Sequence, residues 1–177
     1  MCCECYPGDR PLSEEESSNV ATYLEGRSSE LRAFLDIHSY SQLMLSPWGW
    51  TNEVPQEYRQ MKALMKAATD AIHDTTGKVY AFGRGYSTIY PTYGDTIDYT
   101  YGNLGVIHSY CLELRPGENE PNGFLLPSCE IITTGREIMA ALKAITPILA
   151  NEKVTVGEDN GRLKRIKEKR REKHVFN

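Results

Sequence analysis

The chain has 177 residues, of which 40% are hydrophobic and 25% are charged, and its formal net charge is −4. This composition is that of a soluble globular protein, and the length supports one sizeable core. No stretch approaches the roughly 20 apolar residues that a membrane-spanning helix needs. The N-terminus has neither the basic start nor the apolar run of a signal peptide. We therefore expect one domain, and no membrane partner.

Positive charge gathers near the C-terminus, where the segment 161–173 carries eight Lys or Arg residues against two Glu residues. A segment with so few apolar residues is typical of a solvated extension. Its basic residues lack interleaved aromatic residues, so we expect no nucleic-acid partner. The alternative is that the tail binds nucleic acid or an anionic surface. The sequence thus predicts a folded unit over residues 1–150 and a basic, disordered tail over 151–177.

The first predicted elements are a helix and a strand. Ser13, three residues before Glu16, is typical of a capping box, and the helix should end near Gly26. Residues 31–37 are mostly apolar, which predicts a strand with both faces covered. His38 follows at its carboxyl end. In open α/β sheets ligands bind at that edge, so His38 is a candidate site residue.

An amphipathic helix is predicted from residue 55 to about 76, because apolar residues recur at three- and four-residue steps and Gly77 stands at the C-cap position. Residues 78–82 should form a short strand. The Gly, Tyr, Thr and Asp content of residues 83–101 predicts a long irregular loop. Loops of that length in compact domains are usually functional.

The second half is predicted to hold a strand, a connector and a helix. Residues 107–114 form the strand, and residues 123–127 form a buried connector. The last helix should begin near Thr133 or Thr134 and be disturbed by Pro147, whose ring removes a backbone donor. Together these elements predict an α/β fold.

Two polar side chains stand inside apolar, strand-like segments. Burying a carboxylate such as Glu113 without a partner costs several kcal/mol, on the order quoted for desolvated polar groups. The position of Glu113 in this strand therefore indicates that a metal, a cation or a substrate lies nearby. The plainer alternative is an ion pair with Arg115, which alternation places on the same face of the strand. For His38 the alternative is a hydrogen-bonded histidine without a metal, since one imidazole does not fix a zinc ion.

Five short motifs, taken together in this order and spacing, resemble the C-terminal half of the zinc metallocarboxypeptidases of the carboxypeptidase A/B type. The resemblance covers roughly residues 2–150. The motifs are His38-Ser39-Tyr40-Ser41-Gln42, Thr88-Ile89-Tyr90-Pro91, Ile97-Asp98, Leu112-Glu113-Leu114-Arg115 and Gly123-Phe124-Leu125-Leu126-Pro127. The implied fold is the C-terminal half of a mixed-sheet peptidase domain with helices packed on the sheet.

The resemblance implies a role for each candidate residue. Glu113 looks like the catalytic carboxylate and His38 like the third zinc ligand. Tyr90 resembles the mobile tyrosine that closes over bound peptide, and Tyr40 resembles a subsite residue. Ile97 matches the base of the pocket for the terminal side chain, where an aliphatic residue suggests an A-type preference for apolar or aromatic residues. Asp95, apparently in place of a family glycine, weakens that preference.

The family's His-x-x-Glu zinc pair and its substrate-binding arginines belong to the half that this sequence does not contain. We therefore expect zinc as the cofactor with one ligand present here, and an isolated chain that is inactive. Peptide C-termini or a carboxypeptidase inhibitor are the implied partners, and secretion is implied for the parent protein. A partial gene model would explain both the missing half and the missing signal. The alternative is a non-catalytic remnant that still binds peptides or inhibitors.

The chain has five cysteines, and three of them crowd into the first five residues. Structural zinc sites need four ligands, and no second Cys/His cluster follows, so a cysteine metal site is the less favoured interpretation. The resemblance implies instead that Cys2 matches a family cysteine whose disulfide partner lies upstream.

Overall fold

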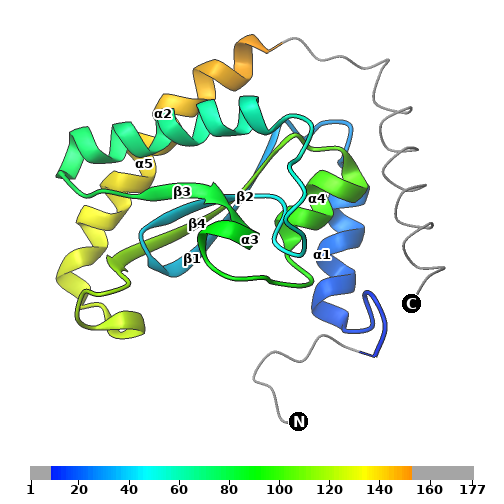
Figure 1. Ribbon diagram of the computed structural model, residues 1–177, viewed down its shortest axis with the longest axis horizontal. Coiled ribbons are helices and arrows are strands. Elements are labelled where there is room, and N and C mark those ends of the chain that lie inside the picture. The colour runs from blue at the N-terminus through cyan, green and yellow to red at the C-terminus, as the bar shows by residue number, and fades with distance from the viewer. Residues whose placement is uncertain (1–8, 153–177) are drawn as a thin grey trace.

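The computed structural model describes residues 9–152, so residues 153–177 of the predicted tail and Cys2, Cys3 and Cys5 lie outside it. Figure 1 shows a small mixed sheet with helices around it. The helices are α1 (Glu15–Glu25), α2 (Tyr58–Thr76), α3 (Gly85–Thr88), α4 (Thr96–Leu104) and α5 (Ile131–Asn151), with 3-10 turns η1 (Gly123–Leu125) and η2 (Ser128–Glu130). The strands are β1 (Ala33–Ser41), β2 (Leu43–Ser46), β3 (Ala81–Arg84) and β4 (His108–Gly117).

The sheet has the spatial order β1-β4-β2-β3, with one antiparallel pair between two parallel pairs. β1 and β4 run parallel, so residues far apart in the sequence come to lie side by side. β2 runs antiparallel to β4 and parallel to β3. The predicted α/β class with a mixed sheet is therefore confirmed.

One face of this sheet carries the hydrophobic core. Helices α2 and α5 pack against each other and lie together on one side of the sheet (Figure 1). From α2 the fully buried residues include Met61, Met65 and Ile72, and from β4 they include Tyr110 and Leu112. The three- and four-residue spacing in α2 produces this stripe, and Gly77 ends the helix in the left-handed region, at φ 72°, as predicted.

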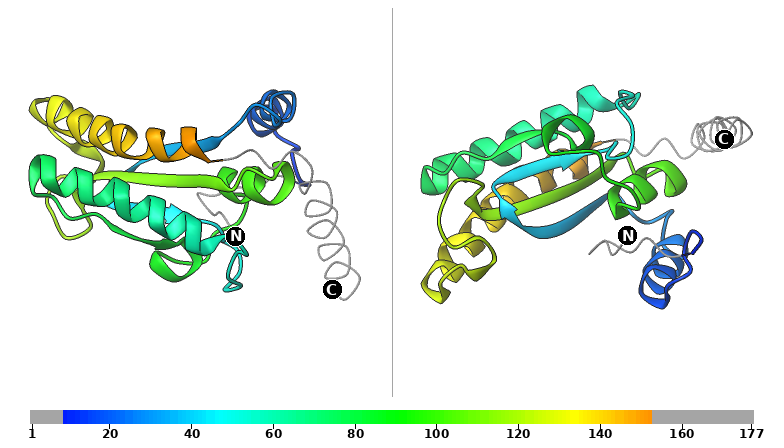
Figure 2. Two further views of the ribbon diagram at one scale, coloured as in Figure 1. Left: turned by 90° about the horizontal axis from the view of Figure 1, so that it is seen from above. Right: turned by 60° about the horizontal axis from the view of Figure 1, so that its bottom comes forward.

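Helix α1 stands at one end of the molecule beside α4, away from α2 and α5 (Figure 2). Its start differs from the prediction by one residue. Glu14 is the N-cap and makes no side-chain capping bond, and the Ser13 hydroxyl bonds to the Glu14 carboxylate instead. The predicted capping box was therefore wrong, because Ser13 lies one residue too early to reach the helix backbone.

The first strand was predicted too short and too deeply buried. β1 extends to Ser41, so His38 lies within it, and Ile37 is 49% exposed. β1 is an edge strand of the sheet formed by residues 9–152, and none of its own residues is fully buried, so it is not covered on both faces. The strand predicted over 78–82 is formed by residues 81–84, and β2 was not predicted at all.

The segment 83–101 is not a single irregular loop, since α3 and α4 lie within it or overlap it. Only residues 89–95 remain as the connection. The connector over 123–127 is not buried either, because Phe124 is 78% exposed and Leu125 is 85% exposed. The apolar character of residues 123–127 thus did not predict their burial.

Helix α5 begins at Ile131 and continues through Pro147 without interruption. The missing proline N–H would leave the carbonyl of Lys143 without its helical donor. Lys143 and Pro147 are both exposed, so water can bond to that carbonyl. No helix within residues 9–152 is long and apolar enough to cross a membrane.

Candidate active site

The face of the sheet opposite the core carries two rows of polar and apolar residues. In the first row His38 of β1 lies opposite Glu113 of β4, and in the second row Asp36 lies opposite Cys111. Leu45 of β2 pairs with Cys111 and extends the second row. Because successive side chains of a strand alternate between faces, Cys111 and Glu113 of β4 lie on this face, whereas Tyr110 and Leu112 lie on the core face.

His38 is half exposed, and its Nε2 atom lies 3.1 Å from Oδ1 of Asp36. When Nε2 carries the proton and donates it to this carboxylate, Nδ1 keeps a lone pair that can bind a metal. The sequence reasoning missed Asp36. The signal was available, since Asp36 and His38 are two apart in one strand and therefore share a face.

Glu113 has one carboxylate oxygen, Oε2, that is buried without a hydrogen-bond partner among the described residues. Its other oxygen, Oε1, lies 3.8 Å from the Cys111 thiol, a weak donor. Burial raises the pKa of Glu113, and this effect outweighs the opposing influence of His38 and Cys111. A buried, unpartnered carboxylate oxygen is what a general base needs in order to receive a proton.

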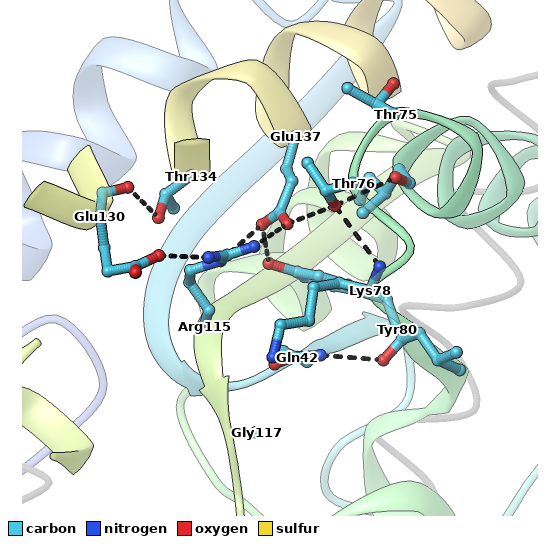
Figure 3. A network of polar contacts seen from close by, with 12 residues as sticks. Gln42, Thr75, Thr76, Lys78, Tyr80, Arg115, Gly117, Glu130, Thr134 and Glu137 are labelled. Carbon is cyan, nitrogen blue, oxygen red and sulfur yellow. Dashed lines mark hydrogen bonds and ion pairs between the residues drawn. The ribbon is translucent and has the colours of Figure 1, made fainter. Parts of the chain in front are cut away.

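The alternative role for Glu113, an ion pair with Arg115, is contradicted. Nε of Arg115 donates to Glu137 at 3.2 Å, and the other two guanidinium nitrogens bond to Glu137 and Glu130. Figure 3 shows Glu137 reaching down from α5 to this guanidinium, with Tyr80 and Thr76 as further partners. Arg115 therefore belongs to a structural network between the sheet and α5.

A cavity of about 310 Å³ opens on this face, and four of the five predicted site residues line it. His38 and Glu113 contribute from the sheet. Tyr90, from the connection between α3 and α4, is 61% exposed, whereas Ile97, from the first turn of α4, is almost fully buried. The structure therefore brings these four residues together.

The fifth predicted residue, Tyr40, does not line that cavity. Its ring packs edge-on against Phe124 with 4.9 Å between the ring centroids. Gly123 lies so close that an added Cβ would come within 3.3 Å of the tyrosine ring. Tyr40 and the exposed turn η1 thus form a separate aromatic contact further along β1.

Helix α4 is fixed beside the cavity by the buried carboxylate of Asp98. It accepts bonds from the backbone N–H of Gly49 at 2.9 and 3.1 Å and from that of Trp50 at 3.3 Å. These bonds join α4 to the segment after β2. Asp98 therefore holds Ile97 in place, and the sequence pattern alone gave no sign of this role.

Zinc fits this site only in part. His38 offers one imidazole nitrogen, but residues 9–152 contain no group of three or more His, Cys, Asp or Glu side chains that could hold a metal ion. A catalytic zinc site takes three protein ligands and keeps one open position. The chain's described part can therefore supply one of the ligands and the facing carboxylate, but not the whole set.

Residues 1–141 match the sequence model of the zinc carboxypeptidase family. The chain belongs to this family. Among curated relatives of the chain, carboxypeptidase B of Rattus norvegicus is 38% identical and mast cell carboxypeptidase A of Homo sapiens is 35% identical. Each match covers 81% of the chain and 34% of the relative, so the chain spans about a third of their length.

A solved structure agrees with the sequence match. The bovine thrombin-activatable fibrinolysis inhibitor, solved in complex with a tick carboxypeptidase inhibitor, superposes with a TM-score of 0.80 at 29% identity. This match covers 84% of the chain and 50% of the solved chain. The recognised family and the carboxypeptidase fold are thus confirmed together.

Proposed function

We propose that this chain is the C-terminal part of the catalytic domain of a zinc-dependent metallocarboxypeptidase, which releases C-terminal residues from peptides. The supporting observation is the pair of His38 and Glu113, opposite each other in register at one wall of a cavity that Tyr90 and Ile97 also line. Family membership supports the reaction class. The folded unit over 1–150 and the basic tail over 151–177 are part of the same proposal.

Glu113 is proposed as the general base and acid. Its Oε2 takes a proton from the attacking water as the water oxygen bonds to the scissile carbonyl carbon. The same carboxyl group then gives the proton to the amine nitrogen as the C–N bond breaks. The raised pKa of Glu113 brings its proton affinity closer to neutral pH, which suits both steps.

His38 is proposed as one ligand of the metal, through the Nδ1 atom that the Asp36 contact leaves available. When bound by His38 and by ligands outside the described residues, zinc would supply Lewis acidity. The phenol of Tyr90 would hydrogen-bond the peptide and exclude water from the cavity. Tyr40 would contact the peptide further from the bond that is cut, and Ile97 would favour apolar or aromatic terminal side chains.

The isolated chain is expected to be inactive, because its described residues supply one proposed zinc ligand of the three that a catalytic site needs. The test compares the purified chain with a chimera in which all 177 residues follow the N-terminal part of rat carboxypeptidase B. Zinc-dependent release of a C-terminal phenylalanine is expected from the chimera only. His38→Ala and Glu113→Gln should abolish it, and Asp70→Asn, on the exposed side of α2, should not.

Two results would overturn the proposal. Turnover by the isolated chain, lost in His38→Ala, would mean that this chain assembles a complete zinc site. A chimera that folds and binds zinc in equimolar amount but releases no terminal residue would refute the assignment of Glu113. Secretion of the parent protein is proposed together with this function. Detection of the parent protein in culture medium would test it.

A second candidate function is the binding of peptide C-termini or of a carboxypeptidase inhibitor without hydrolysis. The cavity is present although the described residues hold no complete set of zinc ligands, which favours this alternative. The bovine relative solved with a tick inhibitor shows that one relative takes such a partner. Saturable binding of that inhibitor to the chain without turnover would support it.

A further inference from the structure

Strand β1 leaves one of its two edges open in the part of the chain that the structure describes. In the order β1-β4-β2-β3 it pairs with β4 on one side, and no described strand lies on its other side. β3 forms the opposite edge of the sheet, but it has four residues against nine in β1. The outward N–H and C=O groups of such an edge can pair with a strand of another molecule.

The side chains of β1 do little to keep a second strand away. Natural edge strands are often protected by Pro, by Lys or by a bulge. The segment Ala33–Ser41 contains no Pro, Lys or Arg, and its register with β4 is irregular only between Ser39 and Ser41. Ile37, at the centre of the strand, is 49% exposed. Covering this apolar side chain with a further strand would be favourable.

The sequence of β1 is complementary to itself when two copies run antiparallel with Ile37 opposite Ile37. In this register Asp36 of each copy lies opposite His38 of the other. Within one copy these two groups already contact each other, since Nε2 of His38 lies 3.1 Å from Oδ1 of Asp36. In the pair, each imidazole would lie between two carboxylates. Such polar pairs directly across two strands stabilise their association.

Other antiparallel registers are less favourable. A pair centred on Asp36 would bring two carboxylates directly opposite each other, which destabilises a strand pair. A pair centred on His38 would leave Asp36 opposite Tyr40. A register with Asp36 opposite Ile37 would place the core face of one copy beside the cavity face of the other. The register centred on Ile37 instead keeps both copies of Leu35, which packs against the core, on the same side.

We propose that the 177-residue chain forms a two-fold symmetric dimer through β1, by antiparallel pairing centred on Ile37. The partner is a second copy of this chain, and the two four-stranded sheets become one continuous sheet. The contact is isologous, because the same residues meet on both sides of the axis. His38 lies at the contact and meets Asp36 of the second copy. The dimer does not depend on catalysis at the proposed active site.

Sedimentation velocity of the full chain, from low to high micromolar concentration in EDTA, tests the dimer without metal bridges. The mass should rise from 20.0 kDa toward twice that value as the concentration increases. Ile37→Lys places two ammonium groups opposite each other and should weaken the dimer at least about tenfold. The matched control is Val54→Lys, in the loop after β2, where the side chain is 61% exposed. It should leave the dimer unchanged, and circular dichroism checks that both variants fold.

Exchange of the two polar residues tests the register. His38→Asp places a new carboxylate opposite Asp36 and should weaken the dimer. Adding Asp36→His restores a carboxylate opposite an imidazole, in the reversed order, and should recover most of the affinity. No recovery in the double variant would contradict the register centred on Ile37.

A cross-link gives an independent measure, because both copies of position 37 lie on the two-fold axis. Opposite residues of antiparallel strands have Cα atoms about 4.5–5.5 Å apart, within the range that a disulfide spans. Mild oxidation of Ile37→Cys should therefore link position 37 to itself, and mass spectrometry of the peptides distinguishes this link from native cysteines. Ser39→Cys should not link to itself, because about 13 Å of strand separates the two copies of position 39.

A chain that stays monomeric at every concentration would overturn the inference and would indicate a different occupant of this edge. A dimer that Ile37→Lys does not weaken, or a cross-link at position 39 in place of 37, would overturn it as well. None of these results bears on Glu113, whose role is tested separately by turnover of the chimera.

Discussion

The two faces of the sheet are built from the same strands and serve different purposes. Tyr110 and Leu112 of β4 point into a core closed by α2 and α5, whereas Cys111 and Glu113, their direct neighbours, face a cavity. On the core side the carboxylate of Glu137 is paired with the guanidinium of Arg115. On the other side Glu113 has a buried oxygen with no hydrogen-bond partner among residues 9–152. Neighbouring positions of β4 thus face a packed core and an open cavity.

The largest effect is expected on the core side, at Glu137. Its side chain is fully buried and bonds Arg115, Tyr80 and Thr76 (Figure 3). Glu137→Ala leaves the guanidinium without its main partner, which should lower the free energy of unfolding by about 3–5 kcal/mol. Urea unfolding followed by circular dichroism measures this, with the exposed Glu118→Ala as the control.

A smaller loss of stability is expected at Leu112, which is 1% exposed. Leu112→Ala removes buried apolar surface and leaves a cavity between β4 and the helices, at a cost of about 2–4 kcal/mol. The urea midpoint should fall with an unchanged slope. A variant as stable as the parent chain would show that α2 and α5 do not close on this face in solution.

The neighbouring substitution Glu113→Gln should change the free energy of unfolding by less than about 1 kcal/mol, because the carboxylate makes no strong contact that stabilises the fold. It should nevertheless abolish turnover by the chimera. Measuring Leu112→Ala and Glu113→Gln by the same urea titration compares how much each face of the sheet contributes to the free energy of unfolding. A destabilisation as large as that of Leu112→Ala would mean that Glu113 is a structural residue.

The smallest effect concerns the surface pair of Lys78 and Glu120. The hydrogen bond from Lys78 lowers the pKa of Glu120, so the folded carboxyl group holds its proton less tightly than the unfolded one. The resulting contribution to the free energy of unfolding is present above the ordinary carboxyl pKa. It is lost as the pH falls through the lowered pKa of the folded state. Both side chains are partly exposed, so it should not exceed about 1 kcal/mol.

Lys78→Met should therefore reduce the free energy of unfolding slightly at neutral pH and leave it nearly unchanged in strong acid. Measurements at several pH values check the sign. A loss that grows as the pH falls would contradict the assigned direction of the Glu120 shift.

Sequence patterns selected residues that meet around one cavity, but they predicted the elements around that cavity less well. The motif around Glu113 and the one around His38 identified two residues that the parallel pairing of β1 and β4 then placed opposite each other. The pattern failed at Phe124 and Leu125, which are apolar but exposed. The prediction of a loop between residues 83 and 101 also failed. The Gly and Asp content there indicated irregular structure, but helices α3 and α4 form. Composition reports local preference, and burial depends on what packs against a segment.

The sequence by itself determined the family, the α/β class and the long helix α2, because these depend on local periodicity and on short motifs. The same motifs supplied the candidate site residues, which stay a prediction. Only the tertiary structure decided which of those residues share one cavity and that Asp36 and Asp95 join them there. It also assigned Arg115 to Glu137 and Glu130 in place of Glu113. These outcomes depend on contacts between residues distant in the chain, which strand register and helix packing fix and which no local pattern encodes.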